Sequence, residues 1–310
     1  MVTIELDGRK LRVPEGTTIL EAAQSANIPI PHLCYLKDIN EIAACRMCMV
    51  EVEGTERLQP ACNTWVTEGM VIRSNTPKVR QARRTNLRLI LSQHNSNCTV
   101  CIRSGNCELQ KLSHDLNIHY QPYPIQLERS PIRLDTPVVR EASKCIKCMR
   151  CVQVCDKIQE MHVWDQIGTG SRATVSVSHS RYLKDTDCTF CGQCVTHCPT
   201  GALTVRDDTG RVLEALADPE ITTVVQVAPA VRVAWAESWG LGAKYATAGR
   251  IVSALKHMGF DYVFDTNFTA DLTIMEEGSE FVQRFTHRGK YRWPMFTSCC
   301  PGWVSFLKSQ

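Results

Sequence analysis

The most distinctive chemistry in this 310-residue chain belongs to its cysteines. There are 17 of them, an odd number, and they fall in tight clusters instead of being spread along the chain. A disulfide framework usually needs an even number, whereas thiolates at short regular spacing are typical of metal ligands. We therefore expect a cytoplasmic metalloprotein, since thiols stay reduced in that compartment.

The first cysteine set lies near the N-terminus, and only its middle pair has C-x-x-C spacing. Its members are Cys34, Cys45, Cys48 and Cys62. Four thiolates gathered from one loop and one later point could hold either zinc or a 2Fe–2S cluster. The spacing departs from that of plant-type ferredoxins, so these residues alone leave both metals open.

The second set combines one histidine with three cysteines. Its members are His94, Cys98, Cys101 and Cys107. Zinc is commonly bound by three cysteines and a histidine, so zinc and a 4Fe–4S cluster are both open here. If a cluster is bound, the neutral imidazole makes the site less negative and should raise its reduction potential.

The third set is an internal repeat. The spacing C-x-x-C-x-x-C-x-x-x-C occurs twice, 43 residues apart, at Cys145, Cys148, Cys151 and Cys155 and again at Cys188, Cys191, Cys194 and Cys198. This is the bacterial ferredoxin run, in which the fourth cysteine of each copy ligates the other 4Fe–4S cluster. We therefore expect Cys198 to complete the first copy's site and Cys155 to complete the second. Two interlocked copies make zinc a weak alternative here.

The elements that position these ligands are partly visible in the sequence. Residues 2–13 alternate around Asp7-Gly8 and predict a β-hairpin. Thr18 and Glu21 form a capping box before a helical apolar face. Thr76-Pro77 predicts the start of a helix running toward Ser92. Residues 121–137 contain four prolines and predict a linker or an extended connection.

Beyond residue 218 the pattern changes to that of a new α/β domain. An apolar strand at 222–227, a helix at 251–258 closed by Gly259 and a strand at 262–264 form a βαβ pattern. We expect residues 294–296 to end a strand and Pro301-Gly302 to open the next element.

Composition excludes several classes of protein. The hydrophobic content of 44% is ordinary for a globular protein, and the formal charge of +3 is too small to indicate a nucleic-acid partner. No apolar stretch is long enough for a membrane span, and the N-terminus has no signal-peptide core.

Together the cysteine sets resemble the N-terminal half of an FeFe hydrogenase of the multi-cluster, clostridial type. Residues 1–207 alone do not settle this, because the large subunit of respiratory NADH dehydrogenase and some formate dehydrogenases look like this over much of that length. Three later stretches resemble FeFe hydrogenases: A-P-A-V-R at 228–232, D-L-T-I-M-E-E at 271–277 and T-S-C-C-P-G-W at 297–303. The last is the first signature of the hydrogen-activating H cluster.

The resemblance implies an α+β multidomain protein with four parts. They are a β-grasp 2Fe–2S ferredoxin domain (1–78), a small helical 4Fe–4S domain with one histidine and three cysteine ligands (79–120), a bacterial two-4Fe–4S ferredoxin domain (136–208) and the start of an α/β hydrogenase domain (218–310). It implies one 2Fe–2S and three 4Fe–4S clusters in this chain. The H cluster, a 4Fe–4S cube joined to a diiron subcluster, is implied for the full-length parent only.

Within the T-S-C-C-P-G-W stretch the resemblance gives the two cysteines different roles. Cys300 takes the place of a cube ligand, and Cys299 takes the place of a proton-transferring thiol. A thiol suits that task because its unperturbed pKa, near 8.5, is close to neutral pH. Without the motif, two structural cysteines would be the ordinary interpretation.

The remaining implied site residues lie upstream. Glu277, Glu280 and Arg284 share one helix face, and by spacing alone they predict a surface ion pair. In the family the corresponding positions carry protons between the thiol and solvent. Ala228, Pro229 and Ala230 correspond to a segment beside the diiron subcluster, although such a turn also occurs in ordinary α/β loops.

We accordingly expect the electron-relay portion of an FeFe hydrogenase. Electrons would pass between a ferredoxin or an NAD(P)H-oxidising flavoprotein subunit and an H cluster that reversibly reduces protons to H2. In the family three later cysteines complete the H-cluster ligands, and the chain ends before them, so we expect no hydrogen chemistry from it alone. The alternatives are an iron–sulfur subunit of NADH- or formate-dehydrogenase type and a stand-alone electron-transfer subunit.

Overall fold

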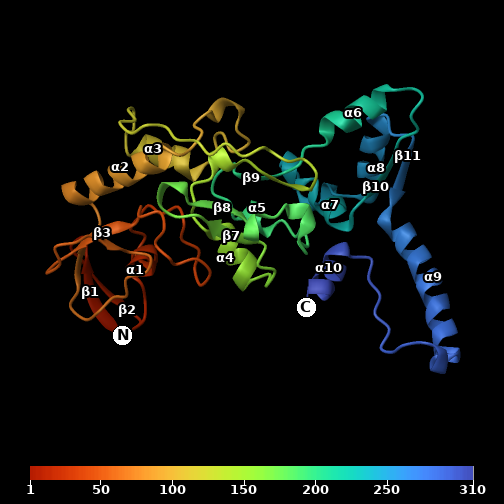
Figure 1. Cartoon of the computed structure of the whole chain (residues 1–310), viewed down its shortest axis with the longest axis horizontal. Coiled ribbons are helices and arrows are strands. Elements are labelled where there is room, and N and C mark those ends of the chain that lie inside the picture. The colour runs from red at the N-terminus through yellow and green to blue at the C-terminus, as the bar shows by residue number, and fades with distance from the viewer. Residues whose placement is uncertain (310) are drawn as a thin grey trace. The chain divides into compact units, whose positions relative to one another are not determined.

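A computed structural model describes residues 1–309 of the chain, which divide into two compact units (Figure 1). Unit 1 comprises Met1–Arg206 together with the segment from Ser298 onward, and unit 2 comprises Asp207–Thr297. In residues 1–309, no helix has the length and apolar character needed to cross a membrane.

Unit 1 begins with a five-stranded mixed sheet. In spatial order its strands are β2 (Arg9–Val13), β1 (Val2–Leu6), β5 (Val71–Arg73), β3 (Met49–Val52) and β4 (Gln59–Pro60). β1 and β2 form the predicted antiparallel hairpin, with Val2 opposite Val13, and β1 runs parallel to β5. The alternating side chains Ile4 and Leu6 are buried on one face, which explains why the period-2 pattern predicted this sheet.

Helix α1 (Ile19–Ser25) covers the core of this sheet, and its predicted capping box is confirmed. The Thr18 hydroxyl accepts from the backbone N–H of Glu21, and the Glu21 carboxylate accepts from the N–H of Thr18. The helix packs Ile19 and Leu20 against Val50 of β3 in one fully buried cluster. Local capping and core burial therefore agree on where α1 begins.

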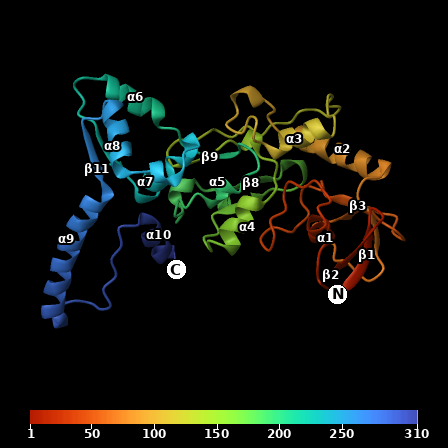
Figure 2. The ribbon, with the colours of Figure 1, turned by 180° about the vertical axis from the view of Figure 1, so that it is seen from behind.

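Helices α2 (Pro77–Leu91) and α3 (Glu108–Asp115) lie next to each other in both views of the ribbon (Figure 2). Thr76 caps α2 as predicted, accepting from the N–H of Val79 at 3.2 Å. Leu87 of α2 and Leu109 of α3 are buried in a shared apolar cluster. This packing places the loop between the two helices, which carries the second cysteine set, against the rest of unit 1.

The predicted extended connection is confirmed, because residues 118–134 contain no helix or strand. It is nevertheless bound along its length. The Gln121 side chain donates to the carbonyl of Arg88 at 2.6 Å, and the backbone N–H of Gln126 donates to the carbonyl of Ser92 at 2.8 Å. The connection therefore follows the surface of α2.

The repeated cysteine run folds around two small antiparallel sheets and two short helices. The elements are β6 (Val138–Arg140) paired with β9 (Leu203–Val205), β7 (Trp164–Ile167) paired with β8 (Thr174–Val177), α4 (Arg150–Lys157) and α5 (Gln193–Thr196). The backbone repeats with the sequence: Lys147 and Phe190 have φ of 55° and 52°, and Met149 and Gly192 have φ of 65° and 77°. Equivalent positions in the two copies thus adopt the same left-handed turns.

Unit 2 contains the predicted βαβ pattern. Its elements are α6 (Thr209–Ala217), β10 (Val224–Val227), α7 (Pro229–Ala234), α8 (Ala248–His257), β11 (Tyr262–Asp265) and α9 (Thr266–Thr286). β10 and β11 are parallel, with Val225 opposite Val263. Gly259, just past α8, has φ of 108°, which agrees with its predicted role in ending that helix.

The predicted strand end at Pro294–Phe296 is wrong. These residues belong to an irregular segment between α9 and α10 (Pro301–Ser309). Among the described residues, the sheet of unit 2 contains β10 and β11, and residues 294–296 pair with neither strand. A strand requires a partner, and the local apolar run could not supply one. The prediction that Pro301-Gly302 opens an element is confirmed.

Candidate iron–sulfur sites

The first cysteine set converges in the loop before β3 and just after β4. All four thiols are buried. Hydrogen bonds from the thiols of Cys45 and then Cys62 lower the pKa of Cys34 to about 2. The pKa of Cys62 is raised because its thiol bonds to Cys34 and Cys48. These contacts place the four sulfurs within reach of one another, as a shared metal centre requires.

The ligand loop of the first set has an unusual backbone. Asp38, Ala43 and Arg46 have φ of 61°, 54° and 53°. Non-glycine residues seldom adopt this left-handed conformation, and it costs free energy at an alanine or arginine. The loop thus turns sharply three times between Cys34 and Cys48, which brings their thiols together. Strain of this kind is typical of ligand-binding loops.

In the second set, the orientation of His94 is fixed by a backbone group. Its Nδ1 lies 3.1 Å from the carbonyl oxygen of Lys144, which can only accept a hydrogen bond. Nδ1 therefore carries the proton, and the lone pair of Nε2 is free for a metal. Burial lowers the pKa of His94, which favours the neutral form that a ligand needs.

Cys101 and Cys107 of the second set lie against the loop that follows Cys198. A Cβ added at Gly201 would lie 3.0 Å from the Sγ of Cys101, so the backbone approaches this thiol closely. The guanidinium of Arg103 donates to the carbonyl of Cys198 at 3.0 Å. The second set and the duplicated run therefore share a tightly packed boundary.

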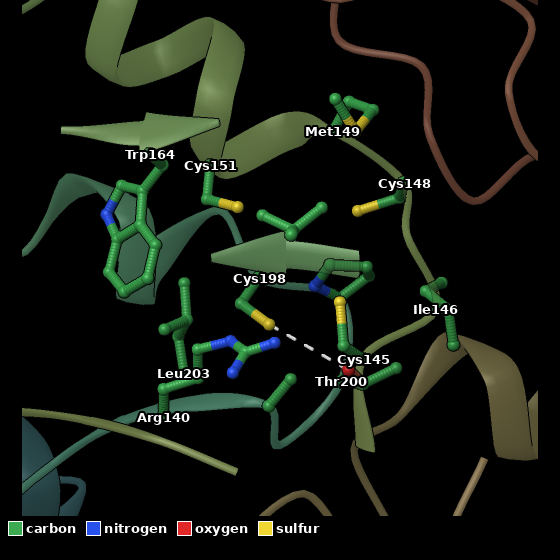
Figure 3. A pocket seen from close by; sticks show the side chains of 13 residues that line it. Arg140, Cys145, Ile146, Cys148, Met149, Cys151, Trp164, Cys198, Thr200 and Leu203 are labelled. Carbon is green, nitrogen blue, oxygen red and sulfur yellow. Dashed lines mark hydrogen bonds between the residues drawn. The ribbon is translucent and has the colours of Figure 1, made fainter. Parts of the chain in front are cut away.

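In the duplicated run, the four cysteines expected to form one site line a single hollow (Figure 3). They are Cys145, Cys148, Cys151 and Cys198. Figure 3 shows their sulfurs pointing toward a common space, with Trp164 on one side of it. Burial raises the pKa of Cys148 to about 12 and also raises that of Cys151. Such buried thiols give up protons when cationic iron compensates the thiolate charge.

The four cysteines expected to form the other site line a second hollow. They are Cys155, Cys188, Cys191 and Cys194. Burial raises the pKa of Cys194 to about 12, as it does for Cys148. Trp164 lines both hollows, so one indole lies between the two groups of thiols. The structure thus brings Cys155 and Cys198 together with the opposite copy, as the interlocked repeat predicts.

Backbone N–H groups point at equivalent sulfurs in the two copies. The N–H of Lys147 donates to the Sγ of Cys145, and the N–H of Phe190 donates to the Sγ of Cys188, both at 3.4 Å. These donors depend on the left-handed turns at the same two positions. Hydrogen bonds to ligand sulfurs raise the reduction potential of an iron–sulfur cluster.

One buried apolar cluster contains ligand candidates from all three sets. Its fully or largely buried members include Cys34, Cys45 and Cys148, and Cys107 packs against it. In residues 1–309, no group of three or more His, Cys, Asp or Glu side chains is arranged to hold a single metal ion.

The two cysteines near the C-terminus are both exposed in unit 1. Cys300 directly precedes α10, and its Sγ accepts from the N–H of Trp303 at 3.4 Å. A Cβ added at Gly302 would lie 3.1 Å from the carbonyl oxygen of Thr189 and 3.6 Å from the Sγ of Cys300. The segment therefore packs against the loop between Cys188 and Cys191.

The predicted polar face of α9 is present in unit 2. Arg284 and Glu280 form an ion pair with Nη2–Oε1 at 2.5 Å, and the hydroxyl of Thr297 donates to Glu277 at 2.7 Å. Glu280 is exposed, whereas Glu277 and Arg284 are half-buried. This geometry is that of a surface ion pair, and the proton-carrying role of these residues stays a prediction.

The Ala228-Pro229-Ala230 segment follows β10 directly and opens α7. Ala228 is the N-cap, and Pro229 occupies the first helical turn, where a missing N–H costs nothing. All three residues are exposed within unit 2. The strand before them is also more exposed than its apolar sequence predicts, with Val227 its buried residue.

Sequence reasoning missed two buried polar side chains next to the ligands. Asn40 lies in the loop between Cys34 and Cys45, and Arg150 lies between Cys148 and Cys151. The sequence did offer a signal, because both residues stand between ligand cysteines. A polar side chain that is buried at such a place needs a specific partner.

Four protein-family models match the chain, each over a different part of it. Residues 1–77 match a "2Fe-2S iron-sulfur cluster binding domain", and residues 83–122 match the "NADH-ubiquinone oxidoreductase-G iron-sulfur binding region". Residues 144–202 match a "4Fe-4S dicluster domain". Residues 221–310 match the "Iron only hydrogenase large subunit, C-terminal domain".

Two curated relatives match the chain over nearly all of its length. The chain is 46% identical over its whole length to the NADP-reducing hydrogenase subunit HndD of Solidesulfovibrio fructosivorans and covers 55% of it. Over 98% of its length it is 36% identical to Iron hydrogenase 1 of Clostridium pasteurianum and covers 53% of it. The chain thus spans about half the length of these relatives.

Other relatives match a shorter part of the chain. One subunit of an NADH-quinone oxidoreductase of Rhizobium meliloti is 36% identical over 66% of this chain, which covers 24% of that protein. Among solved structures, a chain of an NAD+-reducing NiFe hydrogenase in the H2-reduced state superposes with a TM-score of 0.61 at 27% identity. That match covers 66% of this chain and 87% of the other.

Proposed function

Because this chain is related along its whole length to the iron-only (FeFe) hydrogenases, we propose that it is the electron-relay portion of such an enzyme. It passes single electrons between an electron partner and the H cluster, where protons are reversibly reduced to H2. Its place of action is the cytoplasm, where thiols stay reduced. The resemblance inferred from the three sequence motifs is confirmed by these relatives.

The observation that carries this proposal is the pair of neighbouring hollows in the duplicated run. Each hollow is lined by three cysteines from one copy and one from the other. Such interlocked runs are typical of two-cube ferredoxins, in which the fourth cysteine of each run ligates the other cluster. The donor set therefore fits two 4Fe–4S clusters, one in each hollow.

The other two sets extend the relay. The buried thiols of the first set fit a 2Fe–2S cluster in a β-grasp domain, and the second set fits a cube with His94 as its fourth ligand through Nε2. Bound clusters supply one-electron chemistry with little ligand movement. The protein's own contribution is to hold the ligands in a buried core and to direct N–H donors at their sulfurs.

For the two cysteines near residue 310, we propose that Cys300 is a ligand of the H-cluster cube in the complete enzyme and that Cys299 transfers protons. Support comes from the T-S-C-C-P-G-W stretch and from the contact between Gly302 and the loop that bears Cys188. Glu277, Glu280 and Arg284 are assigned to proton movement toward solvent, and residues 228–230 to the diiron pocket. These assignments follow the family pattern.

The partners follow from the relatives. One relative is named as an NADP-reducing hydrogenase subunit and another as an NADPH-Fe(3+) oxidoreductase subunit, so an NAD(P)H-oxidising flavoprotein subunit is the proposed electron partner. Ferredoxin is the alternative donor. The match to NADH-quinone oxidoreductase subunits stops at 66% of the chain, whereas residues 221–310 match a hydrogenase domain. The hydrogenase assignment is therefore favoured over the dehydrogenase one.

Elemental analysis of the anaerobically reconstituted chain tests the relay. One 2Fe–2S and three 4Fe–4S clusters predict about 14 irons per chain, with no zinc. Electron paramagnetic resonance (EPR) of the reduced protein should then resolve a 2Fe–2S signal beside those of the cubes. Zinc in place of iron at any set would remove that set from the relay.

A further inference from the structure

The boundary between the first cysteine set and the duplicated run is joined by one side chain. Asn40 is fully buried in the loop that follows Cys34. Its amide nitrogen donates to the carbonyl of Cys34 at 2.7 Å and to the carbonyl of Cys148 at 2.9 Å. Both hydrogens of one amide therefore connect a ligand candidate of one cluster to a ligand candidate of another.

A buried guanidinium reinforces the same boundary from α4. Arg150 donates through Nε to the carbonyl of Cys34 at 3.3 Å and through Nη2 to that of Tyr35 at 3.2 Å. Its Nη2 also lies 3.9 Å from the carboxylate of Glu108, the residue after Cys107. A buried charge needs partners, and this one, carried by the duplicated run, finds them next to the first and second cysteine sets.

The arrangement is not explained by fold stability alone. The Oδ1 of Asn40 is buried and has no hydrogen-bond partner in the part of the chain that the structure describes. An unpaired buried acceptor costs free energy, so the amide is held in place by its two donors. Leu33 and Met47 are fully buried in the apolar cluster that contains Cys34 and Cys148.

We propose that Asn40 and Arg150 are positioning residues that clamp the Cys34 loop onto Cys148 and thereby set the rate of direct electron exchange between the two clusters. This inference rests on the proposed function, since it requires a cluster on each side. With a 2Fe–2S cluster held by the first set and a cube held by Cys145, Cys148, Cys151 and Cys198, one electron would pass from the reduced 2Fe–2S cluster to the oxidised cube. No bond forms or breaks, and no proton moves. A one-electron reductant supplies the electron.

The mechanism is geometric. Electron exchange between buried clusters falls steeply as their separation grows, and the two ligand-bearing loops belong to segments far apart in the sequence. Hydrogen bonds to the carbonyls of Cys34 and Cys148 restrain the backbone next to a ligand on each side. Loss of these bonds removes a donor from the carbonyl of Cys148 and leaves Arg150 as the side-chain donor to that of Cys34, which shifts the loop toward undocked conformations.

The test compares Asn40→Leu with Lys157→Gln in the full reconstituted chain. Leucine keeps a similar branched shape but removes both donors. Lys157 contacts the same loop through the carbonyl of Ile39 at 2.8 Å but is exposed, so its variant is the matched control. After photochemical one-electron reduction, rapid freezing and EPR follow the electron from the 2Fe–2S signal to the cube. We expect exchange about tenfold slower in Asn40→Leu, because that is the population shift produced by losing a buried bond, and unchanged in Lys157→Gln.

A second readout needs no kinetics. In the fully reduced wild-type chain, the neighbouring paramagnetic cube speeds the spin relaxation of the 2Fe–2S cluster. In Asn40→Leu that signal should saturate at lower microwave power, whereas Lys157→Gln should match wild type. A fold-stabilising role alone would lower the melting temperature without changing relaxation in the folded protein.

Iron content separates the possible failures. Wild-type protein without iron in the first set would overturn the proposed function itself. Full iron content with wild-type exchange and relaxation in Asn40→Leu would overturn the clamp. If Asn40→Leu fails to fold, Asn40→Ser, which keeps one donor, and Arg150→Gln replace it. Intermediate slowing in both supports the clamp, and wild-type exchange in both overturns it.

Discussion

The two compact units of this chain bury their apolar side chains to very different extents. In unit 1, Leu6, Leu87 and Leu109 are 2% exposed or less, and the buried clusters include most of the cysteines. In unit 2, Ile274 and Met275 on α9 are each 70% exposed. The ligand loops of unit 1 thus form part of its core, whereas unit 2 presents apolar surface of the kind that layered α/β domains cover.

The largest expected contrast concerns iron. Cys151→Ala in unit 1 should lose one whole cube, about four of about 14 irons, because the remaining thiolates cannot close the site. Cys300→Ala should retain all of the iron of the isolated chain. Elemental analysis of both variants checks this, and equal losses would show that Cys300 holds a cluster already in this chain.

The second contrast concerns packing. Leu87→Ala should lower the free energy of unfolding by about 2–5 kcal/mol, since it opens a cavity in the core shared by three cysteine sets. Leu272→Ala on α9, where the side chain is 53% exposed, should change it by no more than about 0.5 kcal/mol. Urea titrations of the two variants measure the difference. A large effect of Leu272→Ala would mean that α9 is covered in solution.

The third contrast concerns local opening. Backbone amides of β1 and α4 should exchange with solvent at least about 100-fold more slowly than those of β10, because opening free energies range from near zero to the global value. Hydrogen exchange followed by mass spectrometry resolves the units without separating them. Equal protection would contradict the division of the chain into a well-packed and a sparsely packed unit.

The smallest expected effect distinguishes sites within unit 1. His94→Cys should keep the iron content but lower the potential of that cube, on the order of tens of millivolts, because a thiolate replaces a neutral imidazole. A redox titration followed by EPR measures the shift. An unchanged potential would count against His94 as a ligand.

Sequence patterns predicted the elements whose causes are local. The Asp7-Gly8 hairpin, the Thr18 capping box and the Thr76-Pro77 helix start each depend on residues within a few positions of one another, and all three are confirmed. The strand end at 294–296 failed because pairing depends on a distant partner. Exposure of β10 was missed for a similar reason, since burial depends on what packs against a strand.

The candidate sites also combine features that have local causes with contacts between distant residues. Metal-ligand spacing is a local property, so the grouping of Cys198 with the first copy of the repeat could be expected before the hollow was seen. The bridge from Asn40 to Cys148 joins residues 108 positions apart, and no local pattern encodes it. The carbonyl of Lys144 that orients His94 belongs to the same class of contact.

Because each copy of the repeat supplies one ligand to the other copy's site, the order of synthesis determines when each site has all four of its thiols. The first proposed site has three of its thiols once Cys151 has left the ribosome, but it waits 47 residues for Cys198. At about 5–20 residues per second, that is a delay of several seconds. The other site is completed at Cys194, four residues earlier, so both become loadable almost together. The set ending at Cys62 has no such wait. A scaffold that delivers clusters during translation would therefore meet two early acceptors, the sets ending at Cys62 and Cys107, and then two more almost together.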